Sequence, residues 1–256
     1  YFIERRSIEM ADLAISPSRY LLQWMHERGF KLPSRTLVRP NLLETPLSTR
    51  AAETPEEVVF FGRLEYRKGI VQFCSAIDRL VARGEVPKQV VFLGKLGFVG
   101  EEHAAIYLAR RSRGWPMPVE ILSRLGQPEA LDVLKARRCV AVIPSTVENS
   151  PYTVYECLMA GVPVIARDVG GIAELYAPEH HKTHLFNDNP NSLADKLADA
   201  LSGRLPKARL SFSPEENYRQ WTEELPALVE KIKTEHTRKL ASESQPLVSI
   251  CLTHYR

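Results

Sequence analysis

The sequence lacks several features that would assign it to a specialised class. Its four cysteines are scattered with no C-x-x-C spacing, so we interpret them as reduced core residues of a cytoplasmic protein. No apolar run approaches the roughly 18 residues of a membrane span, and no signal peptide is visible. The charges nearly cancel, since 34 Lys and Arg against 31 Asp and Glu leave +3. Nucleic acid is therefore not an expected partner.

Two patterns typical of cofactor sites are also missing. Gly94, Gly97 and Gly100 do not match G-x-G-x-x-G, which argues against a dehydrogenase cofactor site. His180, His181 and His184 follow a proline but have no fourth ligand, so we expect no metal there.

The chain begins with Tyr1 instead of Met and stops shortly after an apolar run, so we expect a piece of a longer protein. Its length allows one large domain with pieces of others. Its composition, with 25% charged and 44% hydrophobic residues, is ordinary for a soluble globular protein.

Short apolar strands alternate with amphipathic helices through the middle of the chain. The expected strands are 57–61, 89–93, 119–122, 139–143 and 162–166, and the expected helices are 70–81, 128–137, one ending at Gly161, one from 189 to about 201, and one starting at Ser213. This alternation predicts an α/β fold, a Rossmann-like parallel sheet with helices on both faces. Ligands bind such sheets at the carboxyl ends of the strands, so Gly62, Gly94, Gly126 and Pro144 should share one edge.

The two ends of the chain differ from this middle part. Residues 1–45 contain two helices and two short strands, too few for a core of their own. We expect domain boundaries that assign 1–45 to the remnant of a preceding domain and its linker, 46–225 to the Rossmann-like domain, 226–245 to a helical extension or linker, and 246–256 to the first strand of a following domain.

The most informative segment reads E-N-S-P-Y-T-V-Y-E, from Glu148 to Glu156. Ser150 is a suitable N-cap for a helix with Pro151 at its first position. The amides of Tyr152 and Thr153 would then form an anion site at the helix start. Glu156, in the first turns, could accept from both hydroxyls of a vicinal diol such as a ribose, and Glu148 could bind further hydroxyls. The residues alone leave open a purely structural helix start with two solvated glutamates.

A basic loop follows the first strand of the middle region. Arg63 and Lys68 lie between Gly62 and Gly69, and two cations facing a helix N-terminus could clamp a diphosphate. A solvated surface loop is the competing interpretation, and this loop alone favours it.

Together, the two segments resemble the donor-binding half of the family 4 glycosyltransferases. The resemblance extends from about Val58 to Leu225 and includes Gly62-Arg63-x4-Lys68-Gly69, Pro144-Ser145, Glu148-x7-Glu156, Ala160-Gly161-Val162-Pro163-Val164-Ile165-Ala166 and Gly170-Gly171-Ile172-Ala173-Glu174-Leu175. It implies the C-terminal half of a GT-B fold, which binds a nucleotide sugar.

The resemblance also implies roles for individual residues. Arg63 and Lys68 would bind the diphosphate, Glu156 the ribose, Glu148 the transferred sugar, and the amides of Tyr152 and Thr153 phosphate or sugar. The segment Leu125-Gly126-Gln127 corresponds to the loop against the base. The sequence departs from the family where Gly is common, at Asn149 and Pro151. Because Pro151 has no N–H, one amide contact is absent and the identity of the donor sugar stays open.

The activity implied is transfer of a glycosyl group with retained configuration from a UDP-, GDP- or ADP-sugar to a glycan or lipid-linked acceptor. No metal is required when Arg, Lys and a helix terminus stabilise the leaving diphosphate, and the sequence has no Asp-x-Asp. Because most of the acceptor domain is absent, this chain alone should be inactive. The alternatives are a non-catalytic nucleotide-sugar-binding module and, with less support, a sugar-nucleotide epimerase.

Two weaker signals concern partners. The basic stretch from Arg110 to Trp115 could touch the inner face of a membrane or a polyanionic acceptor, although a solvated loop is favoured. Residues 246–255 resemble the first strand of family 2 (GT-A) glycosyltransferases, which would imply a second transferase module among the other domains of the polypeptide.

Overall fold

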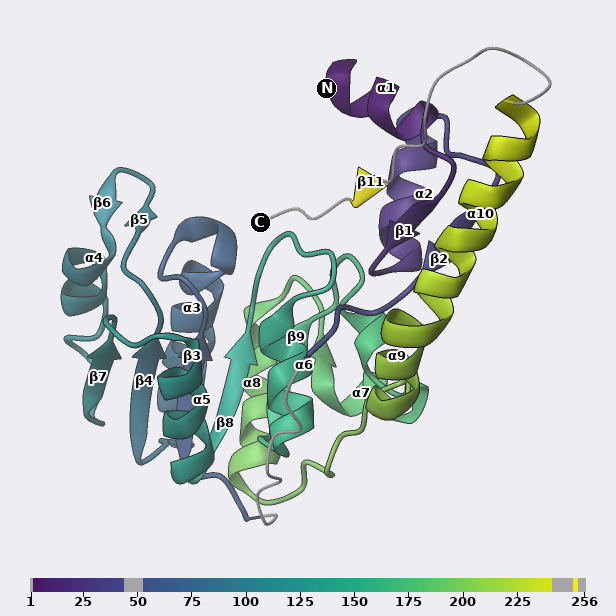
Figure 1. Ribbon diagram of the computed structural model, residues 1–256. Helices are drawn as coiled ribbons and strands as arrows, with labels where there is room; N and C mark the ends of the chain where they lie inside the picture. Colours follow the sequence, from purple (N-terminus) through teal and green to yellow (C-terminus); the bar gives the residue numbers. More distant parts are fainter. Residues whose placement is uncertain (1, 44–52, 241–250, 253–256) are drawn as a thin grey trace. The chain divides into compact units, whose positions relative to one another are not determined.

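The computed structural model describes residues 2–43, 53–240 and 251–252 (Figure 1). The chain forms two compact units, one comprising Thr45–Ser211 and the other Tyr1–Glu44 with Phe212–Arg256. The larger unit therefore ends earlier than the expected boundary at residue 225.

The larger unit is built on a sheet of six parallel strands. In sheet order these are β7 (Val119–Leu122), β4 (Gln89–Leu93), β3 (Glu57–Phe61), β8 (Cys139–Ile143), β9 (Val164–Arg167) and β10 (Leu185–Phe186). In chain order the sheet therefore runs 3-2-1-4-5-6, the order of a Rossmann fold. The strands are near-continuous runs of apolar residues because both faces are covered, as expected for a parallel sheet.

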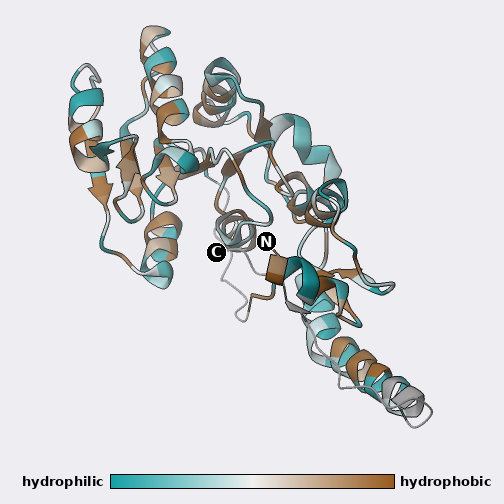
Figure 2. Cartoon of the chain, turned by 90° about the horizontal axis from the view of Figure 1, so that it is seen from above, coloured by the Kyte–Doolittle hydropathy of each residue, from teal (hydrophilic) through white to brown (hydrophobic). Residues whose placement is uncertain are grey.

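Helices cover both faces of this sheet (Figure 1). On one face α3 (Ile70–Ala82) packs against α8 (Pro190–Leu201), and Arg79 and Arg83 bond Asn191 and Asp195 at 2.6 Å each. On the other, α5 (Gln127–Ala136) packs against α6 (Tyr152–Ala160). Figure 2 shows the sheet strands mostly in brown and the helices in two tones, the amphipathic pattern that the sequence predicts.

Smaller elements connect these layers. The hairpin of β5 (Phe98–Val99) and β6 (Glu102–His103) leads into α4 (Ala104–Arg111). Short 3-10 turns form at Tyr66–Lys68, Ala173–Leu175 and Pro178–His180, and the last of these runs into α7 (His181–His184).

Aromatic rings fill the core between the sheet and α3. Phe60 and Phe92 lie on neighbouring strands with ring centroids 5.9 Å apart, and Phe73 of α3 meets each of them edge-on at 5.4 Å. Trp115 stacks on Phe92 at 6.5 Å and donates from its indole nitrogen to Asp78 at 2.8 Å. The buried indole thereby keeps a hydrogen-bond partner.

A second buried group is the imidazole of His184. It is fully buried, with Tyr176 and His180 as ring neighbours at 5.9 and 5.5 Å and the Thr183 hydroxyl 2.8 Å from Nδ1. Burial lowers the pKa of His184 to about 4, because the charged form would lose its hydration. The side chain is therefore neutral in the folded protein above that pH.

We expect this histidine to make stability depend on pH. Since its pKa is lower when folded than when unfolded, the unfolded chain binds the extra proton first as the pH falls. The free energy of unfolding should fall by about 3 kcal/mol from this group between pH 6.5 and 4. Urea titrations of the protein and of His184→Gln at several pH values check this, and the variant should have a shallower slope.

At pH 8 both forms lack the charge, so the difference there reports packing alone and serves as the internal control. Equal slopes for the two proteins from pH 6.5 to 4 would contradict the prediction.

The smaller unit combines the two ends of the chain. It contains α1 (Phe2–Glu9), β1 (Ala14–Ser16), α2 (Arg19–Glu27), β2 (Thr36–Val38), α9 (Pro214–Arg219), a π-helical turn (Gln220–Glu224), α10 (Leu225–Leu240) and β11 (Cys251–Leu252). Its parallel sheet has the order β11-β1-β2, and Leu13, Ile15 and Ile232 form its core. The N-terminal segment thus gains from α10 the core that it lacks alone.

The C-terminal helices also bind the segment that follows β2. Trp221 donates to the carbonyl of Pro40 at 2.8 Å, and the Asn217 amide donates to that of Asn41 at 3.2 Å. The π-helical turn precedes Pro226, whose missing N–H interrupts the regular helical bonding pattern. Because α9, this turn and α10 follow one another without a gap, the helical extension expected from residue 226 is continuous with α9. The two described residues of β11 pair with Ala14 and Ile15, and residues 246–250 lie outside the described residues.

Candidate functional site

The order of the strands creates one switch point in the large sheet. β3 and β8 are neighbours, yet the chain leaves β3 toward α3 on one face and β8 toward α6 on the other. In open α/β sheets, ligands bind outside the carboxyl ends of the strands at this point. The basic loop with Arg63 and Lys68 follows β3, and the segment from Glu148 to Glu156 follows β8. The fold therefore brings these two segments together.

Glycines let the loops at this edge pack tightly. Gly69, the N-cap of α3, has φ +79°, and a Cβ built on it would lie 1.8 Å from the carbonyl oxygen of Pro144. Gly94 has φ +151°, and a Cβ there would lie 2.0 Å from the carbonyl oxygen of Gly62. Close backbone contacts therefore join the ends of β3, β4 and β8. Gly62 serves this packing, since its amide donates to Leu93 at 3.0 Å.

The loops after β3 and β8 meet in an ion pair between Lys68 and Glu148. Both side chains are mostly shielded, with 19% and 12% of their areas exposed. Thr146 reinforces the junction, because its amide and hydroxyl donate to the carbonyl of Arg67 at 2.9 and 3.0 Å. A shielded cation and a shielded carboxylate are thus held together at the switch point.

Arg63 has a different setting from the one expected. Its side chain is 63% exposed and its guanidinium lies 3.5 Å from Glu65, which also pairs with Arg67 at 3.3 Å. The structure therefore pairs Lys68 with Glu148 and Arg63 with Glu65. A clamp that uses Arg63 and Lys68 together would require Arg63 to turn away from Glu65.

The start of α6 corrects the expected capping. The helix begins at Tyr152, and Pro151 occupies the N-cap position with φ −71° and ψ 129°, so Ser150 is not the cap. The first helical bond runs from Tyr155 N–H to the carbonyl of Pro151 at 3.4 Å. A proline at this position donates nothing, and the first helical amides are those of Tyr152 and Thr153. These two amides keep their predicted place at the positive end of the helix dipole.

Glu156 lies in the second turn of α6 and is nearly buried, with 2% of its surface exposed. Burial raises the pKa of its carboxyl, and a hydrogen bond from the amide of Gln127 acts in the opposite direction. Burial and the nearby charge of Glu156 also raise the pKa of the Tyr152 phenol. The sequence singled out Glu156, but gave no sign that Gln127 contacts it.

Gly126 is the N-cap of α5, at the carboxyl end of β7. Its amide donates to the Glu129 carboxylate at 2.5 Å, and its carbonyl accepts from Ala130 at 3.0 Å. This cap fixes the direction in which Gln127, the first residue of the helix, leaves the loop.

The other sequence candidates are occupied by structural contacts. Arg110 bonds Glu102 at 2.7 Å, and Arg111 pairs with Asp78. His181 lies 3.1 Å from the carbonyl of Tyr176, whereas His180 and His184 are buried. Within residues 2–43, 53–240 and 251–252, no group of three or more metal-binding side chains converges and no helix is long and apolar enough to cross a membrane.

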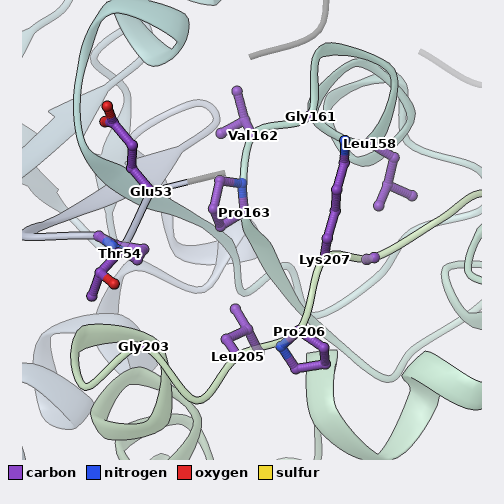
Figure 3. A pocket seen from close by; sticks show the side chains of 12 residues that line it. Glu53, Thr54, Leu158, Gly161, Val162, Pro163, Gly203, Leu205, Pro206 and Lys207 are labelled. Carbon is purple, nitrogen blue, oxygen red and sulfur yellow. The ribbon is translucent and has the colours of Figure 1, made fainter. Parts of the chain in front are cut away.

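A cavity of about 190 Å³ lies at the other end of the sheet (Figure 3). Its lining includes the C-terminus of α6 at Gly161, Pro163 before β9, and Thr54 before β3, with Lys207 extended toward α6. It contains none of the paired charges described above, so we assign the chemistry to the carboxyl edge.

The strand order, the ion pair at the switch point and the helix start beside it define a Rossmann-like domain of the kind found in GT-B proteins. The chain belongs to the group 1 glycosyl transferases, whose family model matches residues 44–220.

The chain spans about a third of the length of the curated relatives that it matches. One, from Bacillus subtilis (strain 168), is named for glycosyl transfer in teichuronic acid biosynthesis (TuaC) and is 32% identical over 160 residues, 62% of this chain and 34% of the relative. The glycogen synthase of Mycobacterium tuberculosis is 30% identical over 130 residues, 50% of this chain and 30% of that one.

Solved structures support the fold. Sucrose-phosphate synthase from Thermosynechococcus elongatus superposes with a TM-score of 0.63 at 20% identity, covering 94% of this chain and 62% of that one. HepE of Anabaena, solved in complex with UDP and glucose, also gives 0.63 at 18% identity, covering 94% and 66%.

Proposed function

We propose that this chain is the donor-binding part of a retaining, metal-independent glycosyltransferase, and that it binds a nucleoside diphosphate sugar at the carboxyl edge of its large sheet. One observation carries the proposal: Lys68 and Glu148 meet across the switch point, beside the α6 N-terminus and the buried Glu156. This arrangement offers donors for an anion and acceptors for hydroxyls at the edge where the fold binds ligands.

Each part of the donor has a matching group. The ammonium of Lys68 and the amides of Tyr152 and Thr153 suit the diphosphate, and Arg63 lies on the same loop. Glu156 accepts from the ribose hydroxyls, and Glu148 accepts from hydroxyls of the sugar. Gly62 and Gly126 keep the backbone close to the ligand, as the family resemblance implies.

The same groups can stabilise the diphosphate as it leaves the sugar. Breaking the bond between the sugar and the diphosphate places negative charge on the leaving oxygen. Lys68 and the start of α6 can stabilise that charge without a divalent ion, as preorganised cations and dipoles do in other enzymes. Retention of configuration and transfer to a glycan or lipid-linked acceptor follow from the family resemblance, and they complete the proposal for the whole protein.

The neighbours add support for the donor class. The structure of HepE holds UDP and glucose, the two parts of a nucleotide sugar. A nucleotide-sugar donor is therefore the ligand class that we carry over to this chain, with UDP as the first nucleotide to test.

We expect Glu148→Ala to remove the binding energy that the sugar adds to the nucleotide. By calorimetry, the unmodified chain should bind a matching UDP-sugar about tenfold more tightly than UDP, the contribution of one hydrogen bond to a charged group. The variant should bind UDP and UDP-sugar equally, because Lys68 remains available to the diphosphate. In the full-length protein the same substitution should abolish sugar transfer.

The matched control is Glu57→Ala, which removes a shielded carboxylate paired with Arg137 at 2.9 Å at the amino end of β3. It should leave both affinities unchanged. Sugar transfer that persists in the full-length Glu148→Ala protein would instead favour the non-catalytic binding module.

A further inference from the structure

Gln127 is held in place before any ligand arrives. It is the first residue of α5, directly after the Gly126 cap, and Pro128 restricts the backbone beside it. The cap bonds of Gly126 to Glu129 and Ala130 fix the same turn. From this position the exposed Gln127 side chain reaches Glu156, although 29 residues separate them in the sequence.

The carboxylate of Glu156 needs such a partner. It is nearly buried on α6. Among the described residues, the amide of Gln127 donates to it and no cation pairs with it. A buried carboxylate with one neutral donor is poorly compensated for its lost hydration. It is thus suited to accept further hydrogen bonds from a ligand.

We propose that Gln127 is a positioning residue, which holds the Glu156 carboxylate oriented to accept the two ribose hydroxyls of the donor nucleotide. The proposal rests on the function proposed above, since it assigns to Gln127 the support of the same ribose site. The bond from Gln127 fixes one carboxylate oxygen and leaves the carboxylate able to accept from the diol.

The electrostatic surroundings make the contribution of Gln127 measurable. Burial raises the pKa of Glu156 and the Gln127 bond lowers it, so removal of the amide should raise this pKa further. The other titratable groups around it are the Tyr152 phenol and the Cys157 thiol on α6 and, next to Cys157, Cys139 on β8 and Tyr176. Burial raises the pKa values of Tyr152, Cys157 and Tyr176, so these groups stay neutral at neutral pH.

Gln127→Met tests the role, because methionine keeps the length of the side chain and removes the donor. Calorimetric titration with UDP from pH 5 to 8 should show affinity about tenfold weaker at pH 7, the loss expected when one hydrogen bond to a charged group is removed. The acid side of the binding profile should move to higher pH. The ratio of affinities for UDP and 2′-deoxy-UDP should fall, since the carboxylate is no longer aligned with the diol.

The matched control is Gln89→Met. Gln89 donates to Glu120 at 3.1 Å at the amino end of the same sheet. The same chemical change there should leave the affinity, the pH profile and the discrimination between the two nucleotides unchanged. A loss shared by both variants would indicate general destabilisation and would overturn the proposal.

Gln127→Glu is the second variant. It tests the same contact without relying on how a methionine side chain packs at this position. A second carboxylate beside Glu156 should move the acid side of the profile further than methionine does, because two adjacent carboxylates hold a proton between them. Unchanged affinity and an unchanged pH profile in both Gln127 variants would overturn the positioning role. If Glu156→Ala also left UDP binding intact, the ribose assignment itself would fail, and the two failures are thereby distinguished.

Discussion

Replacement of Glu156 with alanine should weaken UDP binding about 100-fold or more, the largest loss of nucleotide affinity that we expect from the truncation of one side chain. Two hydrogen bonds from the ribose to a charged, nearly buried acceptor would be lost, and each contributes about 1.5–3 kcal/mol. Calorimetry with the isolated chain measures this directly. A nucleotide without the 2′ and 3′ hydroxyls should bind the variant and the unmodified chain equally weakly.

The isosteric change Glu156→Gln should stabilise the empty domain. Because burial raises the pKa of Glu156, the folded chain binds the proton of this carboxyl more tightly than the unfolded chain does. The carboxyl therefore contributes to stability below its unfolded pKa, and this contribution is lost as the pH rises through the higher folded pKa. The gain from Gln should therefore be larger at pH 8 than at pH 4. Thermal melts at the two pH values measure it, and UDP affinity that is unaffected by either substitution would sink the ribose assignment.

Replacement of Gly69 with alanine should have the largest effect on folding. The new Cβ would lie 1.8 Å from the carbonyl oxygen of Pro144, and the backbone would keep φ +79°, which side chains disfavour. Because a rigid backbone atom stands in the way, the loop must move and carry Lys68 with it. We expect a loss of about 3 kcal/mol or more in unfolding free energy, with loss of UDP binding.

Gly84→Ala separates the effect of the close contact from the effect of the positive φ. Gly84 has nearly the same φ, +76°, but nothing lies within 4 Å of a Cβ built on it. Its alanine should therefore cost only the backbone term of about 1 kcal/mol. Urea denaturation of both variants gives the comparison, and equal losses would contradict the close contact at Pro144.

Much of the local structure was predictable, because hydrophobic periodicity and the residues that begin or end helices and strands are local signals. The strands at 57–61, 89–93, 119–122 and 139–143 match the prediction, since the strands of a covered parallel sheet are mostly apolar. The Ser213 cap was also correct, and its hydroxyl accepts from Glu216 at 3.1 Å. The cap at Ser150 was wrong because Pro151 has the extended backbone of an N-cap, although proline is more typical of the first helical position.

The candidate site was only partly predictable. Lys68, Glu148 and Glu156 were singled out by residue type and by their spacing around strand ends. The pairing of Arg63 with Glu65 was not foreseen, because several acidic and basic residues of one short loop can combine in more than one way. The resemblance placed Gln127 only in the loop against the base, and nothing in the sequence indicated its contact with Glu156, because that partner lies on another helix.

The amino-acid sequence by itself determined the alternation of strands and helices, the glycines at the strand ends and the acidic and basic residues that follow them. The tertiary structure alone decided that β3 and β8 are neighbours, and hence that Lys68 meets Glu148 across 80 residues of chain. The physical reason is that propensity and periodicity act over a few residues. The order of strands in a sheet instead depends on how the layers pack together, which no short segment encodes.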